Sequence, residues 1–379
     1  MKVRRTAVTL FLLAGLLVIA SGSAEARDQW TPEQANAWYA GMPWMVGANY
    51  APAYAINQLE FWQAETFDPE AIDRELGWAE ELGFTSIRVY LHHLLWEQDR
   101  EGFLKRMDQF LEIADRHDIG VMFVLFDSVW DPHPRLGKQR APQKGLHNSG
   151  WVQSPGADDL MNPERHPLLE DYVRGVIGRF KDDKRVHAWD LWNEPDNTNG
   201  NSYGENKLKQ EPPNKVERTL ALLKKSFVWA RESEPSQPLT SGVWIGNWPD
   251  PEKLNPTERV QLDESDIITF HSYDPLDRAR LCVEHLRRYN RPILCTEYMA
   301  RPRGSTFDPL MGYFKEQKVG AYCWGFVAGK SNTIYPWDSW QKAYETEPPV
   351  WFHDIFRGDG TPYRPEEVEY IRQQTGAGK

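Results

Sequence analysis

The sequence predicts a (β/α)8 TIM barrel of the α/β class, folded as a single domain with long loops at the carboxyl ends of its strands. Eight apolar runs rich in β-branched and aromatic residues recur along the 379 residues. Segments with helical periodicity, or loops, separate these runs. Most runs are almost continuously apolar, as expected of parallel strands covered by helices. Eight strand–helix units favour a closed barrel over an open sheet, because right-handed crossovers return the chain to a parallel neighbour each time.

The apolar runs define the expected strands. We expect them at residues 45–49, 85–90, 121–126, 187–191, 239–243, 267–271, 292–296 and 319–324. An open doubly wound sheet is the structural alternative, and it normally carries a glycine-rich phosphate-binding turn after its first strand. Residues 50–54 instead read Tyr-Ala-Pro-Ala-Tyr. The sequence therefore predicts no nucleotide site at that turn.

Capping signals mark the expected helices. Asp68 and Pro69 form an N-cap and a first-turn proline of a helix that runs to Leu82. The longest insertions, 127–164 and 195–213, leave the carboxyl ends of the third and fourth strands, where such a barrel places its active site. We expect further helices at 99–117, 167–181, 214–233, 276–289, 309–317 and 365–374, a weak one at 256–261, and a short one within 27–42 that covers the closed end of the barrel.

The N-terminal residues have the pattern of a secretory signal peptide. Three basic residues precede an apolar run at 7–20, which is followed by an Ala-Glu-Ala cleavage site at 24–26. The run is shorter than the roughly 20 residues that span a bilayer. We therefore expect a signal peptide at 1–26 and one barrel domain at 27–379, exported to the periplasm or the extracellular space and free of the membrane after cleavage.

Charge and cysteine content restrict the partners. The formal net charge of −11 argues against binding to nucleic acid, because nothing compensates the phosphate charge. We expect a neutral partner and a monomer. Cys282, Cys295 and Cys323 are too few for a disulfide framework, so we expect buried thiols, although the sequence leaves open whether two of them pair.

No cluster of cysteine and histidine has the spacing of zinc ligands. His92 and His93 are adjacent, and in a strand they would point to opposite sides. The sequence therefore predicts chemistry without a metal or cofactor.

Two carboxylates follow expected strands. Glu194 lies in Trp-Asn-Glu-Pro after the fourth strand, where Pro195 ends the strand, and Glu297 lies in Cys-Thr-Glu-Tyr after the seventh. In a barrel the ends of strands four and seven face each other across the mouth. Two carboxyl groups on either side of one bond perform glycoside cleavage, since one protonates the leaving oxygen while the other attacks the anomeric carbon. A purely structural role for both is disfavoured, because buried unpaired carboxylates are costly.

These motifs resemble those of the clan A glycoside hydrolases, the retaining glycosidases on a (β/α)8 barrel, and most of all the family-five cellulases and mannanases. The resemblance rests on Asn193-Glu194-Pro195 and Glu297 and covers about residues 43–375. It implies that Glu194 is the acid/base and that Glu297 is the nucleophile.

The resemblance extends to side chains on other strands. Asn193 matches the asparagine that holds the sugar 2-hydroxyl, and Arg88 matches the arginine beside the nucleophile. His271 and Tyr273 match a His-x-Tyr motif whose tyrosine hydrogen-bonds the nucleophile, and Trp324 matches the aromatic platform under the sugar. The structural alternatives are a salt bridge for Arg88 and core packing for His271 and Trp324.

Electrostatics agrees with this division of roles. Arg88 beside Glu297 would favour the ionised carboxylate and lower its pKa, while Glu194, farther from that charge, would stay protonated near neutral pH. The sequence departs from the family at 126–128 and 92–93. Asp127 and the two histidines are therefore candidates for substrate contact without a family counterpart.

Tryptophan is abundant, with 17 residues in the chain. An exposed indole stacks on the flat apolar face of a sugar. We expect the loop 331–340 to shape the substrate site, and about half of the loop tryptophans to be structural. The tryptophans expected in loops at the open end are Trp130, Trp151, Trp244, Trp248, Trp337 and Trp340.

The sequence thus predicts an exported retaining β-glycoside hydrolase of endo-β-glucanase or β-mannanase type. Its carboxyl groups should lie about 5–5.5 Å apart, as in retaining enzymes. A transglycosylase with the same carboxylate pair and a non-catalytic carbohydrate-binding barrel are the alternatives. The sugar, its linkage, and internal or terminal attack stay open, because loop contacts set specificity.

Overall fold

The computed structural model describes residues 26–202, 208, 211–246 and 248–377. The signal peptide expected at 1–26 lies outside the described residues except for its last position. No helix among the described residues is both long enough and apolar enough to cross a membrane.

Eight parallel strands form the barrel, in the order β5-β4-β3-β2-β1-β8-β7-β6. The segments of β5 and β6 close it through a parallel bridge between Val243 and Phe270, where the Val243 N–H donates to the Thr269 carbonyl at 3.1 Å. The predicted barrel is confirmed. The strands are β1 Val46–Asn49, β2 Ser86–Tyr90, β3 Gly120–Asp127, β4 Val186–Asn193, β5 Leu239–Thr240, β6 Ile268–His271, β7 Ile293–Tyr298 and β8 Gly320–Trp324.

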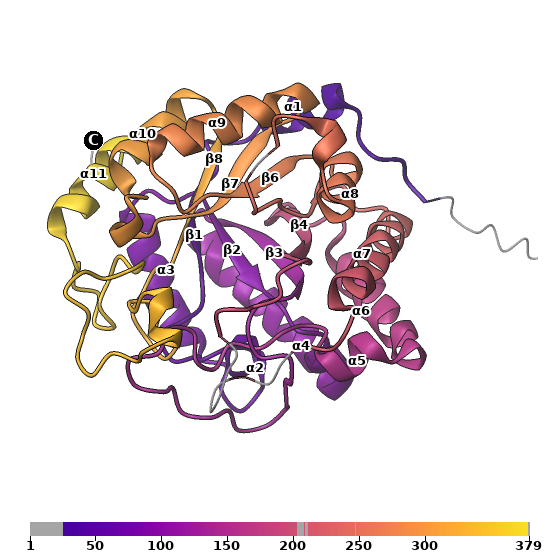
Figure 1. Ribbon diagram of the computed structural model, residues 1–379, viewed down its shortest axis with the longest axis horizontal. Helices are drawn as coiled ribbons and strands as arrows, with labels where there is room; N and C mark the ends of the chain where they lie inside the picture. Colours follow the sequence, from indigo (N-terminus) through magenta and orange to yellow (C-terminus); the bar gives the residue numbers. More distant parts are fainter. Residues whose placement is uncertain (1–25, 203–207, 209–210, 247, 378–379) are drawn as a thin grey trace, which may run out of the picture.

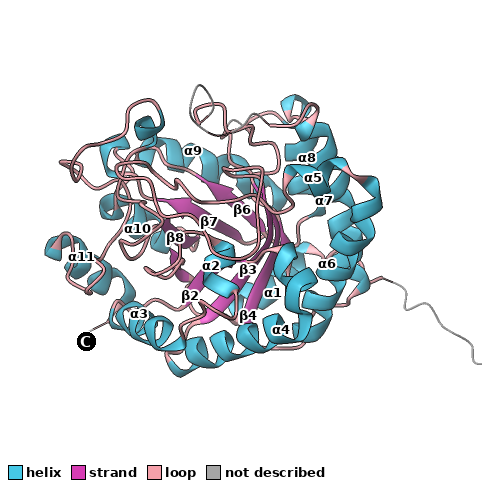
Figure 2. Ribbon diagram, turned by 90° about the horizontal axis from the view of Figure 1, so that it is seen from below, coloured by secondary structure: helices cyan, strands magenta, loops and turns pink. Residues whose placement is uncertain are grey.

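Helices surround the strands as a ring (Figure 1), and Figure 2 shows the strands enclosed between helices and loops. The large apolar core fills the space between sheet and helices. The helices are α1 Pro32–Ala40, α2 Gln58–Trp62, α3 Pro69–Glu81, α4 His93–Arg116, α5 Ala157–Met161, α6 His166–Phe180, α7 Lys215–Glu232, α8 Pro256–Glu264, α9 Leu276–Leu286, α10 Phe307–Glu316 and α11 Pro365–Thr375. Short 3-10 turns are η1 Pro163–Arg165, η2 Pro251–Lys253, η3 Arg287–Tyr289, η4 Arg301–Arg303 and η5 Trp337–Trp340.

The helix expected to cover the closed end is present as α1. Its N-cap Thr31 accepts from the Gln34 N–H, and the Gln34 side chain accepts from the Thr31 N–H, which forms a capping box. Trp30 and Trp38 pack against a small buried cluster at the start of the strands, which includes Met45 and Met122. This end of the barrel is therefore filled with apolar side chains, which leaves the opposite end for the site.

Some helices begin at other residues than expected, or were not expected at all. Helix α4 begins at His93 rather than 99, because the His92 side chain accepts from the Leu94 N–H and caps it. Asp99 then forms a kink with non-helical backbone angles. The short helices α2 and α5 lie inside loops and were not expected from periodicity.

All three cysteines are buried and carry free thiols, as predicted. Cys295 and Cys323 lie on β7 and β8, and Cys282 lies on α9.

Candidate active site

The two predicted carboxylates lie at the carboxyl ends of β4 and β7. Strand β4 ends at Asn193, and Glu194 follows in the left-handed region with a φ of 46°. This conformation costs a residue with a β-carbon about 1–2 kcal/mol. Pro195 follows and the Asn197 N–H donates to the Glu194 carbonyl at 2.9 Å, so the chain turns out of the strand directly after the carboxylate.

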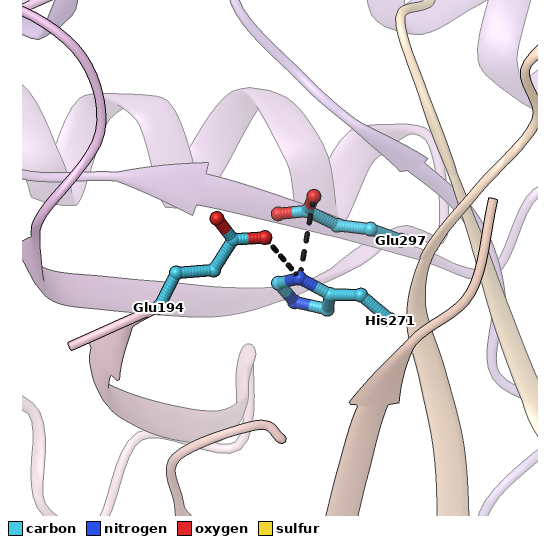
Figure 3. A group of neighbouring side chains, drawn as sticks. All are labelled: Glu194, His271 and Glu297. Atoms are coloured by element: carbon cyan, nitrogen blue, oxygen red, sulfur yellow. Dashed lines mark hydrogen bonds and ion pairs between the residues drawn. The ribbon is translucent and has the colours of Figure 1, made fainter. Parts of the chain in front are cut away.

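His271, at the end of β6, lies between the two carboxylates (Figure 3). Its Nδ1 atom lies 2.8 Å from Oε1 of Glu194 and 3.4 Å from Oε2 of Glu297. Potential ligand atoms of the three residues all lie within 4.8 Å of one another. The carboxylates therefore face the same small volume, as the sequence predicted from the ends of strands four and seven.

Glu297 is held by three donors. Its Oε1 accepts from Nη1 of Arg88 at 2.8 Å and from the hydroxyl of Tyr90 at 2.8 Å, and its Oε2 accepts from the hydroxyl of Tyr273 at 2.7 Å. Burial alone would raise the pKa of Glu297, but electrostatic interaction with His271 and Arg88 and the hydrogen bonds from the hydroxyls of Tyr273 and Tyr90 outweigh it and lower the pKa. Glu297 is thus ionised, as a nucleophile requires.

Glu194 is in the opposite electrostatic situation. Burial raises its pKa and the charge of Glu297 adds to the rise, while His271 and the Asn197 side chain oppose it. Asn197 donates from Nδ2 to Oε2 of Glu194 at 2.6 Å. The pKa of Glu194 is therefore shifted upward and that of Glu297 downward, which is the direction that an acid and a nucleophile need.

Arg88 is fully buried and connects several strand ends. Its Nη1 donates to Asn49 at 2.7 Å, and its Nη2 donates to Asp190 at 2.8 Å and to Asn193 at 2.8 Å. The salt bridge to Asp190 shows that the structural alternative also applies, so Arg88 contacts Glu297 and supports the barrel at once.

Asn193 is fixed at both ends of its amide. Its Oδ1 accepts from Arg88, and its Nδ2 donates to Oδ1 of Asp127 at 3.0 Å. Asp127 is buried, and burial raises its pKa to about 7. Asp127 lies behind Asn193 and does not line the described cleft.

A cleft of about 500 Å³ opens above the two carboxylates, in the size range of ligand pockets. Asn193, Glu194, Glu297 and Trp324 line it. Trp324 is partly exposed and packs edge-on against Tyr90, with ring centroids 5.7 Å apart. Further aromatic side chains that line the cleft are Trp130, Trp244, Tyr273 and Trp337.

Half of the loop tryptophans predicted at the open end line this cleft. Trp337 belongs to the segment 331–340, which we expected to shape the site, and it packs against Tyr273 with ring centroids 5.0 Å apart. Trp248 and Trp340 are buried and brace loops. Trp151 is also buried and donates to Oδ2 of Asp127 at 2.7 Å.

His92 and His93 lie outside the strands, and their side chains do not point to opposite sides as they would in a strand. His92 and His93 follow the end of β2, and their rings stack with centroids 4.8 Å apart. His93 contacts Asp159 at 2.7 Å, and His92 contacts the Gln153 carbonyl at 3.0 Å. Both are fully buried in these contacts and neither lines the cleft.

Sequence reasoning missed Tyr90, Asp190 and Asn197. Tyr90 stands two residues after Arg88 on the same strand, so the period-2 rule places both side chains on the inner face. Asp190 lies on β4 three residues before Asn193, so the period-2 rule does not place these two side chains on one face. The position of Asn197 depends on the turn after Pro195, for which the sequence has no comparable signal.

Glu194, His271 and Glu297 are the residues that could hold a metal ion among those described. Their atoms are engaged with one another and with Arg88 and Tyr273. Chemistry without a metal or cofactor stays a prediction.

No protein-family model and no curated protein matches this sequence. Solved structures do match in fold. A β-1,4-D-mannanase from Cryptopygus antarcticus aligns with a TM-score of 0.54 and 10% identity, covering 89% of this chain and 90% of that one. The exo-β-1,4-mannosidase of Opitutaceae bacterium strain TAV5 aligns with a TM-score of 0.56 and 18% identity, covering 87% of this chain and 59% of that one.

A GH5_18 protein from Streptomyces cattleya, in a variant solved in complex with Manβ1-4GlcNAc, also shares the fold. Its TM-score is 0.55 at 12% identity, and the match covers 87% of this chain and 80% of that one. The chain therefore has the (β/α)8 fold seen in family-five glycoside hydrolases, which confirms at the level of fold the resemblance that the motifs indicated.

Proposed function

We propose that this chain is a retaining β-glycoside hydrolase that cleaves a poly- or oligosaccharide by double displacement. The observation that carries the proposal is the placement of Glu194 and Glu297 around His271, with potential ligand atoms within 4.8 Å and opposite pKa shifts. This close approach of carboxylate oxygens is nearer to the spacing of retaining enzymes than to the wider spacing of inverting ones, which supports the retaining arrangement.

In the first step Glu297 attacks the anomeric carbon as Glu194 gives its proton to the departing oxygen. The bond from the anomeric carbon to that oxygen breaks, and a glycosyl ester forms on Glu297. Arg88, Tyr90 and Tyr273 hold the attacking carboxylate through its two oxygens. The nucleophile is thus fixed in orientation before substrate binds.

In the second step Glu194, now ionised, takes a proton from a water molecule. The resulting hydroxide equivalent attacks the same carbon and releases Glu297, so the anomeric configuration is retained overall. A sugar hydroxyl in place of water would give transglycosylation with the same residues.

The neighbours in fold and the aromatic cleft support a proposal for the substrate class. The three neighbours named above are called a β-1,4-mannanase, an exo-β-1,4-mannosidase and a protein in complex with a β-mannoside. The aromatic side chains around the cleft suit the flat faces of sugars. We place β-mannans first and β-glucans second among the candidate substrates. We further propose that the chain is exported through the 1–26 segment and acts as a monomer on carbohydrate.

The test is to incubate residues 27–379 with soluble β-mannans, β-glucans, xylans and galactans, and to measure new reducing ends and product sizes. NMR of the first product should show the β-anomer. Glu297→Ala should abolish cleavage, and added azide should then yield the α-glycosyl azide from an aryl β-glycoside.

Glu75→Gln is the matched control, because Glu75 is a buried carboxyl group bound to the Tyr50 hydroxyl at 2.9 Å and takes no part in the site. It should retain activity. Cleavage with inversion, or activity that survives Glu297→Ala without azide, would refute the mechanism. No cleavage of any glycan by the wild type would leave a carbohydrate-binding barrel as the better reading.

A further inference from the structure

Strand β3 ends in a buried carboxylate, Asp127, for which the two steps above have no role. It is 1% exposed and pairs in register with Asn193 at the end of β4. A buried carboxylate is costly unless donors compensate it. The identity of those donors therefore indicates what the residue does.

The Asp127 carboxyl group contacts only hydrogen-bond donors among the described residues. Its Oδ1 accepts from Nδ2 of Asn193 at 3.0 Å and from the Val129 N–H at 3.0 Å. Its Oδ2 accepts from Nε1 of Trp151 at 2.7 Å and from Nε2 of Gln58 at 3.3 Å. All four groups donate, which suits the ionised form of a carboxyl group whose pKa burial raises to about 7.

These contacts select one orientation of the Asn193 amide. Arg88 donates to its Oδ1 at 2.8 Å, so the oxygen lies toward the arginine and the nitrogen toward Asp127. The amide nitrogen has two hydrogens, and Asp127 uses one of them. Asn193 lines the cleft beside Glu194, so the second hydrogen is left for a bound molecule.

The other oxygen of Asp127 fixes the aromatic wall. The Trp151 ring lies edge-on to Tyr90, with centroids 5.3 Å apart, and to Trp324, with centroids 6.0 Å apart. Trp324 lines the cleft, and the Tyr90 hydroxyl contacts Glu297. The Asp127 carboxylate therefore connects the Asn193 amide, which lines the cleft, with the Trp151 indole, which packs behind Trp324.

We propose that Asp127 is a positioning residue for the sugar at the cleavage point. It orients Asn193 so that the free amide N–H meets the hydroxyl on the carbon next to the anomeric carbon, and it holds Trp151 behind Trp324. The inference rests on the proposed glycosidase function and adds to it the group that sets recognition of this hydroxyl.

The test compares an aryl β-glycoside of the sugar that the wild type cleaves with its 2-deoxy analogue. Asp127→Asn should lower kcat/KM on the 2-hydroxy substrate by about 10- to 100-fold, the worth of a hydrogen-bond network to a charged group. On the 2-deoxy substrate the loss should be clearly smaller, because only the support of the aromatic wall is disturbed and the misplaced amide has no hydroxyl to meet. Equal losses on both substrates, or no loss on either, would overturn the positioning role.

Asp266→Asn is the control for removal of a buried charge. Asp266 is fully buried at the other end of the barrel, where it accepts from Nη2 of Arg27 at 2.6 Å and from the Leu239 N–H at 2.8 Å. This variant should melt at a lower temperature and keep the wild-type ratio between the two substrates.

Should Asp127→Asn fail to fold, Trp151→Phe keeps an aromatic ring and removes the N–H that donates to Oδ2 of Asp127, together with part of the indole. It should reduce the preference for the 2-hydroxy substrate in the same direction, and an unchanged preference would count against the proposal. In an Asn193→Ala background, Asp127→Asn should have no further effect on that preference. A wild type inactive on every glycan and aryl glycoside would refute the proposed function itself, whereas an active wild type with an unaffected preference refutes only the role of Asp127.

Discussion

Nη1 of Arg88 donates to Oε1 of Glu297 at 2.8 Å, and the arginine side chain has no exposed surface. The same guanidinium forms an ion pair with the fully buried Asp190 at 2.8 Å. One cation therefore compensates two carboxylates, of which one is the proposed nucleophile. Removal of the cation leaves both carboxylates without a buried arginine, and Glu297 then keeps only Tyr90, Tyr273 and His271.

Arg88→Met should therefore affect stability and catalysis together. We expect a loss of about 3–5 kcal/mol in the free energy of unfolding, measured by urea titration, because the variant breaks a buried ion pair on one side only. The loss of positive charge should also raise the pKa of Glu297, so the acid limb of the kcat/KM profile should move to higher pH.

Arg106→Met separates the two effects. Arg106 is largely buried and donates to the Trp62 carbonyl at 2.6 Å, away from the cleft. Arg106→Met should lower the free energy of unfolding and leave the acid limb of the kcat/KM profile at the same pH. An unmoved acid limb in Arg88→Met as well would contradict the role given to Arg88.

The opposite pKa shifts of the two glutamates predict a bell-shaped pH dependence. The reaction needs Glu297 ionised and Glu194 protonated. Activity should fall as the pH drops through the pKa of Glu297, which is below its ordinary value, and as the pH rises through the pKa of Glu194, which is above it. Glu194→Gln, assayed on an aryl glycoside whose leaving group needs no proton, should keep the acid limb of kcat/KM and lose the alkaline limb. An alkaline limb that persists would assign it to another group.

Tyr90→Phe tests a residue that the motifs did not identify. The variant removes the hydroxyl that donates to Oε1 of Glu297 at 2.8 Å and keeps the ring. We expect kcat to fall about 10-fold or more, since a hydrogen bond to a charged group is worth about 1.5–3 kcal/mol. Tyr172→Phe is the control, because the Tyr172 hydroxyl donates only to the Leu125 carbonyl at 3.1 Å. Equal activity in the two variants would refute the role of Tyr90.

Much of the site could be predicted because its parts are local in sequence. A polar residue at the end of an apolar run, as with Glu194 and Glu297, needs only the strand pattern and the barrel rule to be placed at the mouth. The strand bounds agree to within a few residues for the same reason. The fifth strand is shorter than expected, because only Leu239 and Thr240 pair with β4 before the chain bends toward its single bridge to β6.

Contacts that depend on register or on long loops could not be predicted. Asp127 meets Asn193 because a register shift between Val121 and Met122 brings the ends of β3 and β4 level. Trp151 reaches Asp127 from an insertion whose conformation no periodicity describes. The sequence indicated that such loops matter, but which tryptophan lines the cleft and which lies buried depends on tertiary packing.

The cluster of Glu194, His271 and Glu297 is not expected to need a metal ion for activity. Its ligand atoms are close enough for a cation, with distances within 4.8 Å. The positive charge of Arg88 next to Glu297 disfavours one, and both carboxylates are needed for the proposed chemistry. Dialysis against EDTA should leave kcat/KM unchanged. Activity lost in EDTA and restored by a divalent cation would contradict the prediction of chemistry without a metal.

Lys215, at the start of α7, joins the two long insertions. Its Nζ donates to the Ser128 carbonyl at 2.9 Å, to the Asn197 carbonyl at 2.8 Å and to Oε1 of Glu211 at 2.5 Å. Burial lowers the pKa of Lys215 to about 8. The ammonium group therefore supports the loop from which Asn197 reaches the acid/base.

Lys215→Met should cost about 3–5 kcal/mol in the free energy of unfolding, because it leaves Glu211 buried without its cation. The control is Lys330→Met, which removes a partly exposed ion pair to Glu60 and should cost at most about 1 kcal/mol. Loosening of Asn197 should also remove its hydrogen bond to the ionised form of Glu194, so the pKa of Glu194 should rise and the alkaline limb should move to higher pH. Urea titration and the pH dependence of kcat/KM measure the two effects. Similar losses of stability in the two lysine variants would show that Lys215 does not hold the insertions together.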